Sequence, residues 1–196
     1  VREQAERDYQ LASGLSQDVE SHDNVFRQTT ARLPWLLIGM LGGIGNSMIL
    51  GNFDTTFAAH PEMALYIPLI GGTGGNVGTQ SSALVVQGLA NSSLDSGNTF
   101  QQILKESVVA LINATIISML VYIYNFIRFG ATATVSYSVS ISLFAVVMFA
   151  SIFGTLVPMT LEKLKIDPAI ATGPFISITN DIIGMMMYMG ITVLLS

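Results

Sequence analysis

The sequence predicts an all-α polytopic membrane protein with five transmembrane helices. Hydrophobic residues make up 51% of the 196 residues, charged residues only 11%, and the mean hydropathy is +0.57. A soluble domain carries about 25% charged residues, so most of this chain is expected to avoid water. The charges are also unevenly placed, because residues 1–32 hold four of the eight basic and six of the thirteen acidic residues. Long apolar runs follow from Leu33 onward.

Two regions are expected. Residues 1–32 read as a charged cytoplasmic connecting helix or linker, broken near Gly14, that ends a longer soluble region upstream of Val1. Residues 33–196 form a membrane domain. A bilayer-spanning helix needs about 20 apolar residues, and five runs qualify. They are 33–53, 64–90, 108–127, 137–161 and 169–195. Barrel strands would be shorter and would alternate in polarity, as these runs do not.

The basic residues predict the orientation in the membrane. Lysine and arginine accumulate in cytoplasmic loops. If the amino terminus lies inside the cell, five of the six basic residues from Arg27 onward face the cytoplasm and only Arg128 lies outside. The five are Arg27, Arg32, Lys105, Lys163 and Lys165. We therefore expect a multi-pass protein of the cell inner (plasma) membrane with its amino terminus in the cytoplasm and its carboxyl terminus outside.

Composition also excludes several classes of function. With no cysteine, the chain has no disulfide framework, thiolate nucleophile or cysteine metal site. The two histidines, His22 and His60, lie far apart and outside the apolar runs. A net charge of −5 argues against a nucleic-acid partner and suits cationic ones.

The second run is rich in glycine and in polar side chains. "PLIGGTGGNVGTQ", from Pro68 to Gln80, contains five glycines, two threonines, Asn76 and Gln80. Pairs such as Gly71/Gly75 and Gly74/Gly78 would let helices pack closely. The added amide and hydroxyl groups favour a second interpretation, a helix that lines a water-filled cavity.

The fifth run contains a lone acid. Asp181 is the only ionisable residue well inside any of the five spans. A charge at the bilayer centre costs at least about 2.5–3.5 kcal/mol, and no span supplies a basic partner. Three explanations stay open: a protonated buried acid, a water-filled path or a bound cation.

The neighbours of Asp181 indicate which cation would fit. Helical spacing places Ser177, Gly184 and Tyr188 on its face, with Pro174 a turn earlier. The available ligands are oxygens, which select hard cations such as Mg²⁺, Ca²⁺ and Mn²⁺. One carboxylate cannot neutralise a divalent ion, so the charge count favours a homodimer with both Asp181 side chains facing a shared central pore.

Several motifs resemble one known family. "GGTGGNVGTQSSALVVQGLA" in the second run and "DPAIATGPFISITNDIIGMMMYMGI" in the fifth are similar to the MgtE family of Mg²⁺ channels. "RLPWLL", which opens the first run, and "GTLVPMTLEKLKIDPA", which closes the fourth, resemble the same family. The resemblance covers about residues 25–196, with the motifs in the family's order.

The resemblance implies a homodimer whose pore is lined by the second and fifth helices. It implies that Asp181 binds a hydrated Mg²⁺ and that Asp167, at the cytoplasmic end, takes part in Mg²⁺-dependent closure. Cytoplasmic regulatory domains are expected upstream. The expected pore-lining residues are Gly74, Asn76, Gly173, Pro174, Ser177, Asp181 and Gly184. Gly173 and Ser177 stand where some relatives have Asn and Ala, which leaves the ion preference open.

The predicted function is therefore a Mg²⁺-selective channel that conducts into the cytoplasm, and not an enzyme. An ion-coupled secondary transporter of divalent cations is the alternative, because such proteins also use membrane-embedded acids. An intramembrane aspartic protease would need two aspartates, and only one span offers any. The sequence leaves open the gating mechanism, the passage of Ca²⁺, Mn²⁺ or Co²⁺, and the open or closed state.

Overall fold

A computed structural model describes residues 9–16, 19–91, 94, 99–130, 133–171 and 173–195. Within these residues the chain is helical and forms no strand. The long helices are α2 (Val25–Gly51), α4 (Ile67–Ala90), α5 (Thr99–Phe129), α6 (Thr134–Lys163) and α7 (Pro174–Leu195). Short helices connect them: α3 (Asp54–Ala59), η1 (Pro61–Tyr66) and η3 (Pro168–Ala171). Each predicted apolar run overlaps one long helix, although the runs 64–90 and 169–195 begin within the short helices η1 and η3.

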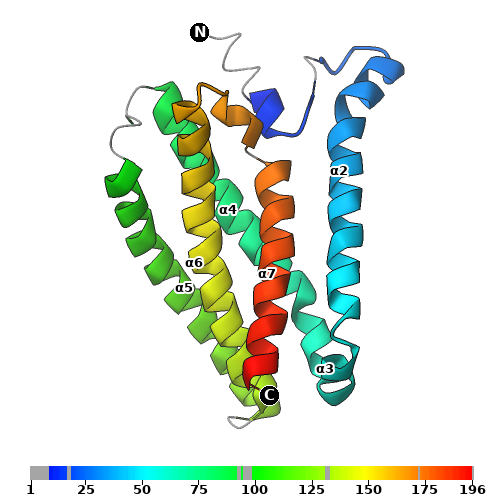
Figure 1. Ribbon diagram of the computed structural model, residues 1–196, viewed down its shortest axis with the longest axis vertical. Helices are drawn as coiled ribbons and strands as arrows, with labels where there is room; N and C mark the ends of the chain where they lie inside the picture. Colours follow the sequence, from blue (N-terminus) through cyan, green and yellow to red (C-terminus); the bar gives the residue numbers. More distant parts are fainter. Residues whose placement is uncertain are drawn as a thin grey trace.

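Four of the long helices are long and apolar enough to cross a membrane: α2, α5, α6 and α7. The prediction that these runs form helices is confirmed, and by length and composition these four are candidate membrane spans. Helix α4 runs along the same bundle (Figure 1) but does not reach the same hydropathy. Its glycines, threonines and amide side chains lower the average without shortening the helix, which has 24 residues.

Helix α6 forms the centre of the bundle. It packs against α4, α5 and α7, while α2 contacts α7 and stands at the edge (Figure 1). Val139, Leu143 and Val146 of α6 are fully buried and form the core with residues of α4, α5 and α7. By contrast, α2 leaves many apolar side chains exposed, among them Leu36, Leu37, Met40, Leu41 and Met48. Burial in this chain alone therefore does not account for the composition of α2.

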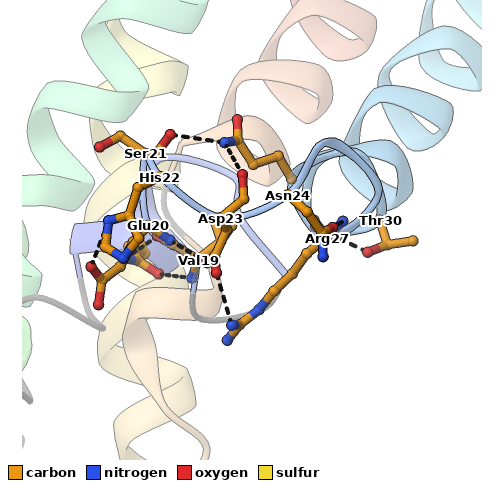
Figure 2. A network of polar contacts seen from close by, with 10 residues as sticks. Val19, Glu20, Ser21, His22, Asp23, Asn24, Arg27 and Thr30 are labelled. Atoms are coloured by element: carbon orange, nitrogen blue, oxygen red, sulfur yellow. Dashed lines mark hydrogen bonds and ion pairs between the residues drawn. The ribbon is translucent and has the colours of Figure 1, made fainter.

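The start of α2 is fixed by local polar contacts, shown in Figure 2. Asn24 caps the helix, since its side-chain oxygen accepts a hydrogen bond from the Arg27 backbone N–H at 2.9 Å. Asp23 accepts from the Arg27 guanidinium at 3.0 Å and from the backbone N–H of Glu20 at 2.8 Å. Helix α2 thus begins at Val25, before the predicted membrane boundary at Leu33.

The segment before α2 folds back onto the bundle. Residues 9–12 are helical and a turn follows, in which Gly14 adopts a φ of +81°, so the predicted break near Gly14 is present. The hydroxyl and backbone N–H of Ser16 both donate to the Ala31 carbonyl at 2.9 Å. A Cβ atom at Gly14 would lie 2.6 Å from Cγ of Pro174, and one at Gly173 would lie 2.0 Å from the Ala12 carbonyl oxygen. This turn therefore joins the start of α2 to the start of α7.

Candidate ion-binding site

The glycine face of α4 packs directly against the part of α7 that carries Asp181. A Cβ atom at Gly75 would lie 2.8 Å from Ser177 Oγ and 3.4 Å from Asp181 Oδ1. At Gly71, one turn earlier, it would lie 3.4 Å from the same carboxylate oxygen. Glycine at these two positions brings the α4 backbone next to the acid, and the predicted close packing of Gly71 and Gly75 is present.

A second glycine pair, Gly74 and Gly78, packs α4 closely against both α6 and α7. A Cβ atom at Gly78 would lie only 1.9 Å from Nδ2 of Asn180. On the α6 side, a Cβ atom at Gly154 would lie 2.4 Å from the Gly78 carbonyl oxygen, and one at Gly74 would lie 2.9 Å from Val146. Three helix backbones therefore converge near Gly78, and the residue after Asn180 is Asp181.

Asp181 has no protein partner in the described part of the chain. Its carboxylate forms no hydrogen bond and no ion pair there, and its side chain is partly buried. It lies about two turns from the start of α7 at Pro174. A carboxylate with free lone pairs beside two glycines has both the charge and the room to take a cation with its water.

The residues predicted to share the Asp181 face divide into two groups. Ser177 joins Asp181 at the α4 glycines. Gly184 and Tyr188 are buried instead. Gly184 faces Val146 of α6, and the Tyr188 hydroxyl donates to the Met63 carbonyl at 2.8 Å. The structure thus brings Ser177 and Asp181 together, whereas Gly184 and Tyr188 pack against the rest of the bundle.

The other predicted pore-lining residues lie apart from Asp181. Asn76 is exposed on α4, one residue beyond Gly75. Gly173 and Pro174 are in contact with the amino-terminal turn. In α4 the Thr79 hydroxyl turns back to the Gly75 carbonyl at 2.9 Å.

The segment that contains η3 lies at the end of the bundle that also holds the amino-terminal turn (Figure 1), and Asp167 is the residue just before η3. Its Oδ1 accepts a hydrogen bond from the Ala169 backbone N–H at 2.9 Å, which caps η3. It also lines a cavity of about 470 Å³ together with Glu162 and Lys165. Asp167 and Asp181 therefore belong to separate sites within this chain.

Sequence reasoning missed a buried acid, Glu106. It lies just before the predicted run 108–127, and only 9% of its surface is exposed in α5. A signal was present in the sequence, because the buried residues of α5 recur at helical spacing: Glu106, Ala110, Ala114, Ser118 and Asn125. Four small or amide side chains in register with an acid indicate that the acid points inward.

Within the described residues, no three or more acidic or histidine side chains come together as a metal site. A site built by one chain here would thus depend on a single carboxylate with hydroxyl, amide or carbonyl oxygens. This matches the weak, water-rich coordination that Mg²⁺ accepts in proteins.

Comparison with known proteins supplies the family context. Residues 67–191 match the family model MgtE, described as a divalent cation transporter. The chain is 31% identical to the magnesium transporter MgtE of Bacillus subtilis over 97% of this chain and 42% of that relative. It is 33% identical to the protein of the same name from Thermus thermophilus, over 84% of this chain and 36% of the relative. The Enterococcus faecalis protein is 29% identical over 97% of this chain and 42% of its own length. The chain thus spans less than half the length of these relatives.

Proposed function

Because the chain belongs to the MgtE family of divalent cation transporters, we propose that it forms the membrane pore of a Mg²⁺-selective channel. In this proposal hydrated Mg²⁺ passes between α4 and α7 toward the cytoplasm, and Asp181 is the central ion-binding carboxylate. The observation that carries the proposal is the position of Asp181, without a protein partner and 3.4 Å from a Cβ built at Gly71 or Gly75.

The location of Asp181 favours an ion over a structural role. An ionised acid at membrane depth needs a compensating charge, and the described spans contain no basic side chain near it. Small neighbours, Gly71, Gly75 and Ser177, leave space at the carboxylate where a larger side chain would exclude water. A cation that keeps part of its hydration shell supplies both the charge and the hydrogen bonds.

We further propose that the pore is formed by two chains. One carboxylate leaves a divalent ion half neutralised, and a two-fold axis near Asp181 would supply the second. The apolar side chains that α2 leaves exposed are available for lipid and for a second chain. On this proposal α4 is the fifth spanning helix, and its low hydropathy reflects its place at the pore.

The proposed orientation has the amino terminus in the cytoplasm. Five basic residues occupy one end of the bundle, at the starts of α2 and α5 and around the end of α6. Arg128 lies at the other end of α5, in its last turn. This asymmetry agrees with the positive-inside rule.

The test is Mg²⁺ flux into liposomes that contain this chain or its Asp181→Asn variant. Asparagine keeps the size of the side chain and removes the charge, so flux should fall sharply. Asp181→Glu keeps the charge and should retain more flux than Asp181→Asn. Equal flux in the parent and the Asp181→Asn variant would contradict the assignment of Asp181.

A second candidate function is ion-coupled transport, favoured by the same membrane-embedded acid. The two mechanisms differ in their driving force. A channel should pass Mg²⁺ under a membrane potential with no counter-ion gradient, whereas a coupled transporter should require a proton or sodium gradient. Flux that disappears when those gradients are removed would favour the transporter.

For Asp167 we propose a role in closure rather than in conduction. It lies apart from Asp181, in the cavity that also contains Glu162 and Lys165. In the longer protein with its expected regulatory domains, Asp167→Ala should shift the Mg²⁺ concentration that closes the channel. An unchanged closure curve would remove Asp167 from this role.

A further inference from the structure

A polar groove separates α4 from α5, with α6 at its base. Its volume is about 550 Å³, and Asp181 is not among the residues that line it. The groove extends along α4 from Val77 to the C-cap residue Asn91 and along α5 from Gln102 to Asn113. Five amide side chains line it: Gln80, Gln87, Asn91, Gln102 and Asn113. So many amides between two helices of an apolar bundle indicate a water-filled space.

The carboxylate of Glu106 lies in this groove and is held by two serines. Ser81 of α4 donates to Glu106 Oε1 at 2.6 Å, and Ser151 of α6 donates to the same oxygen. The two serine hydroxyls lie 3.0 Å apart. Three helices therefore fix one carboxylate oxygen, with Ser81 5% and Ser151 2% exposed.

The second carboxylate oxygen of Glu106, Oε2, is free. Among the described residues it receives no hydrogen bond, and no basic group lies within 4.0 Å of it to form an ion pair. Lys105 also lines the groove, but its side chain is exposed and makes no such pair. Both serine protons are used at Oε1, so the remaining negative charge is directed to a partner in the groove.

We propose that Glu106 is the carboxylate of a second divalent-cation site, separate from Asp181, in which a hydrated ion of the Mg²⁺ type occupies the groove. One carboxylate with several retained waters is a usual way for proteins to bind Mg²⁺. Six waters occupy about 180 Å³ at about 30 Å³ each, which the groove accommodates. Gln80, Gln87 and Asn113 provide amide groups for those waters.

The proposal does not depend on conduction through Asp181, and its test is therefore a binding measurement. Mn²⁺, which is visible by electron paramagnetic resonance, serves as the probe, with Mg²⁺ as competitor. The purified Asp181→Asn variant is compared with Asp181→Asn/Glu106→Gln. We expect the single variant to retain Mn²⁺ binding that Mg²⁺ displaces, and the double variant to bind at least about tenfold more weakly. Identical binding curves would show that Glu106 is a neutral structural acid and would overturn the proposal.

Lys105→Gln gives an independent readout at an exposed position, where folding is not at risk. Removing a positive charge from the groove should tighten Mn²⁺ binding several-fold on the Asp181→Asn background. Unchanged affinity in this variant would also count against a cation in the groove. Lys163→Gln is the matched control. Lys163 is also an exposed lysine, at the end of α6, but it does not line the groove.

Discussion

Asp181 and Glu106 are both acids within the helical bundle, yet the protein holds them in opposite ways. Glu106 is fixed through Oε1 by hydroxyls from two other helices. Asp181 has no hydrogen-bond partner in the described chain and faces the bare backbone of α4 at Gly71 and Gly75. Hydrogen bonds from two hydroxyls therefore hold Glu106, an arrangement called the clamp below, whereas close helix packing alone positions Asp181.

The difference indicates different demands on the two sites. A conducting site must bind an ion well enough to admit it and weakly enough to release it. A carboxylate without fixed protein donors can exchange water and ion freely. A carboxylate held by two hydroxyls keeps one geometry, which suits an ion that stays bound. The comparison predicts that flux depends on Asp181 and static binding on Glu106.

The largest expected effect separates the two acids by flux. Asp181→Asn should lower Mg²⁺ flux in liposomes by at least about tenfold, because about 1.4 kcal/mol of lost ion stabilisation already changes an equilibrium tenfold. Glu106→Gln should leave flux within about twofold, since its groove does not include Asp181. If Glu106→Gln abolished flux while Asp181→Asn conducted, the roles would be exchanged.

The second prediction concerns the packing that positions Asp181. Gly75→Ala would place a Cβ atom 2.8 Å from Ser177 Oγ and 3.4 Å from Asp181 Oδ1. The Ser177 side chain or α7 itself would have to shift beside the acid, which should lower flux several-fold. Gly72→Ala is the matched control, because nothing lies within 4 Å of its Cβ position. Gly72→Ala should conduct normally in the same liposome assay. Equal flux in both variants would mean that close packing at Gly75 does not matter for conduction.

How far the sequence predicts this arrangement differs between the two acids. Asp181 stands out in the sequence because it interrupts a long apolar run, and an isolated charge there requires an explanation. Its contact with Gly71 and Gly75 joins segments more than a hundred residues apart, and helical spacing within one segment cannot show it. For the same reason, spacing grouped Gly184 with Ser177, although the structure turns Gly184 toward α6.

Glu106 illustrates the opposite case. It follows Lys105 near the start of a predicted span, where a charged pair is the ordinary mark of a membrane boundary. Its burial depends on Ser81 and Ser151, two residues with no distinguishing feature in the sequence. Helix α5 is predictable from its apolar run. The two serines that contact Glu106 are not, because they are brought to it only when α4, α5 and α6 pack together.

The third prediction tests the clamp on Glu106. Ser151→Ala removes one of two hydroxyl donors and should weaken Mn²⁺ binding on the Asp181→Asn background by about tenfold or more, since hydrogen bonds to charged groups contribute about 1.5–3 kcal/mol and about 1.4 kcal/mol is tenfold. Flux through an intact Asp181 should not change. Ser140→Ala, a buried serine of α6 whose hydroxyl bonds to the Ser136 carbonyl at 2.8 Å, is the control. If Ser140→Ala weakened Mn²⁺ binding and Ser151→Ala did not, the hydrogen bond from Ser151 would not contribute to the site.

The smallest expected effect lies at the far end of the helix that carries Asp181. The Tyr188 hydroxyl is fully buried and donates to the Met63 carbonyl of η1 at 2.8 Å. Tyr188→Phe leaves that carbonyl without its donor, at a cost of about 1–3 kcal/mol, and each kcal/mol should lower the melting temperature by about 2–4 °C. Tyr122→Phe, at an exposed position on α5, should leave the melting temperature unchanged. Because Asp181 is held two turns away by the α4 glycines, flux through Tyr188→Phe should stay within about twofold of the parent. A large loss of flux without a loss of thermal stability would instead show that the carboxyl-terminal end of α7 sets the geometry of the acid.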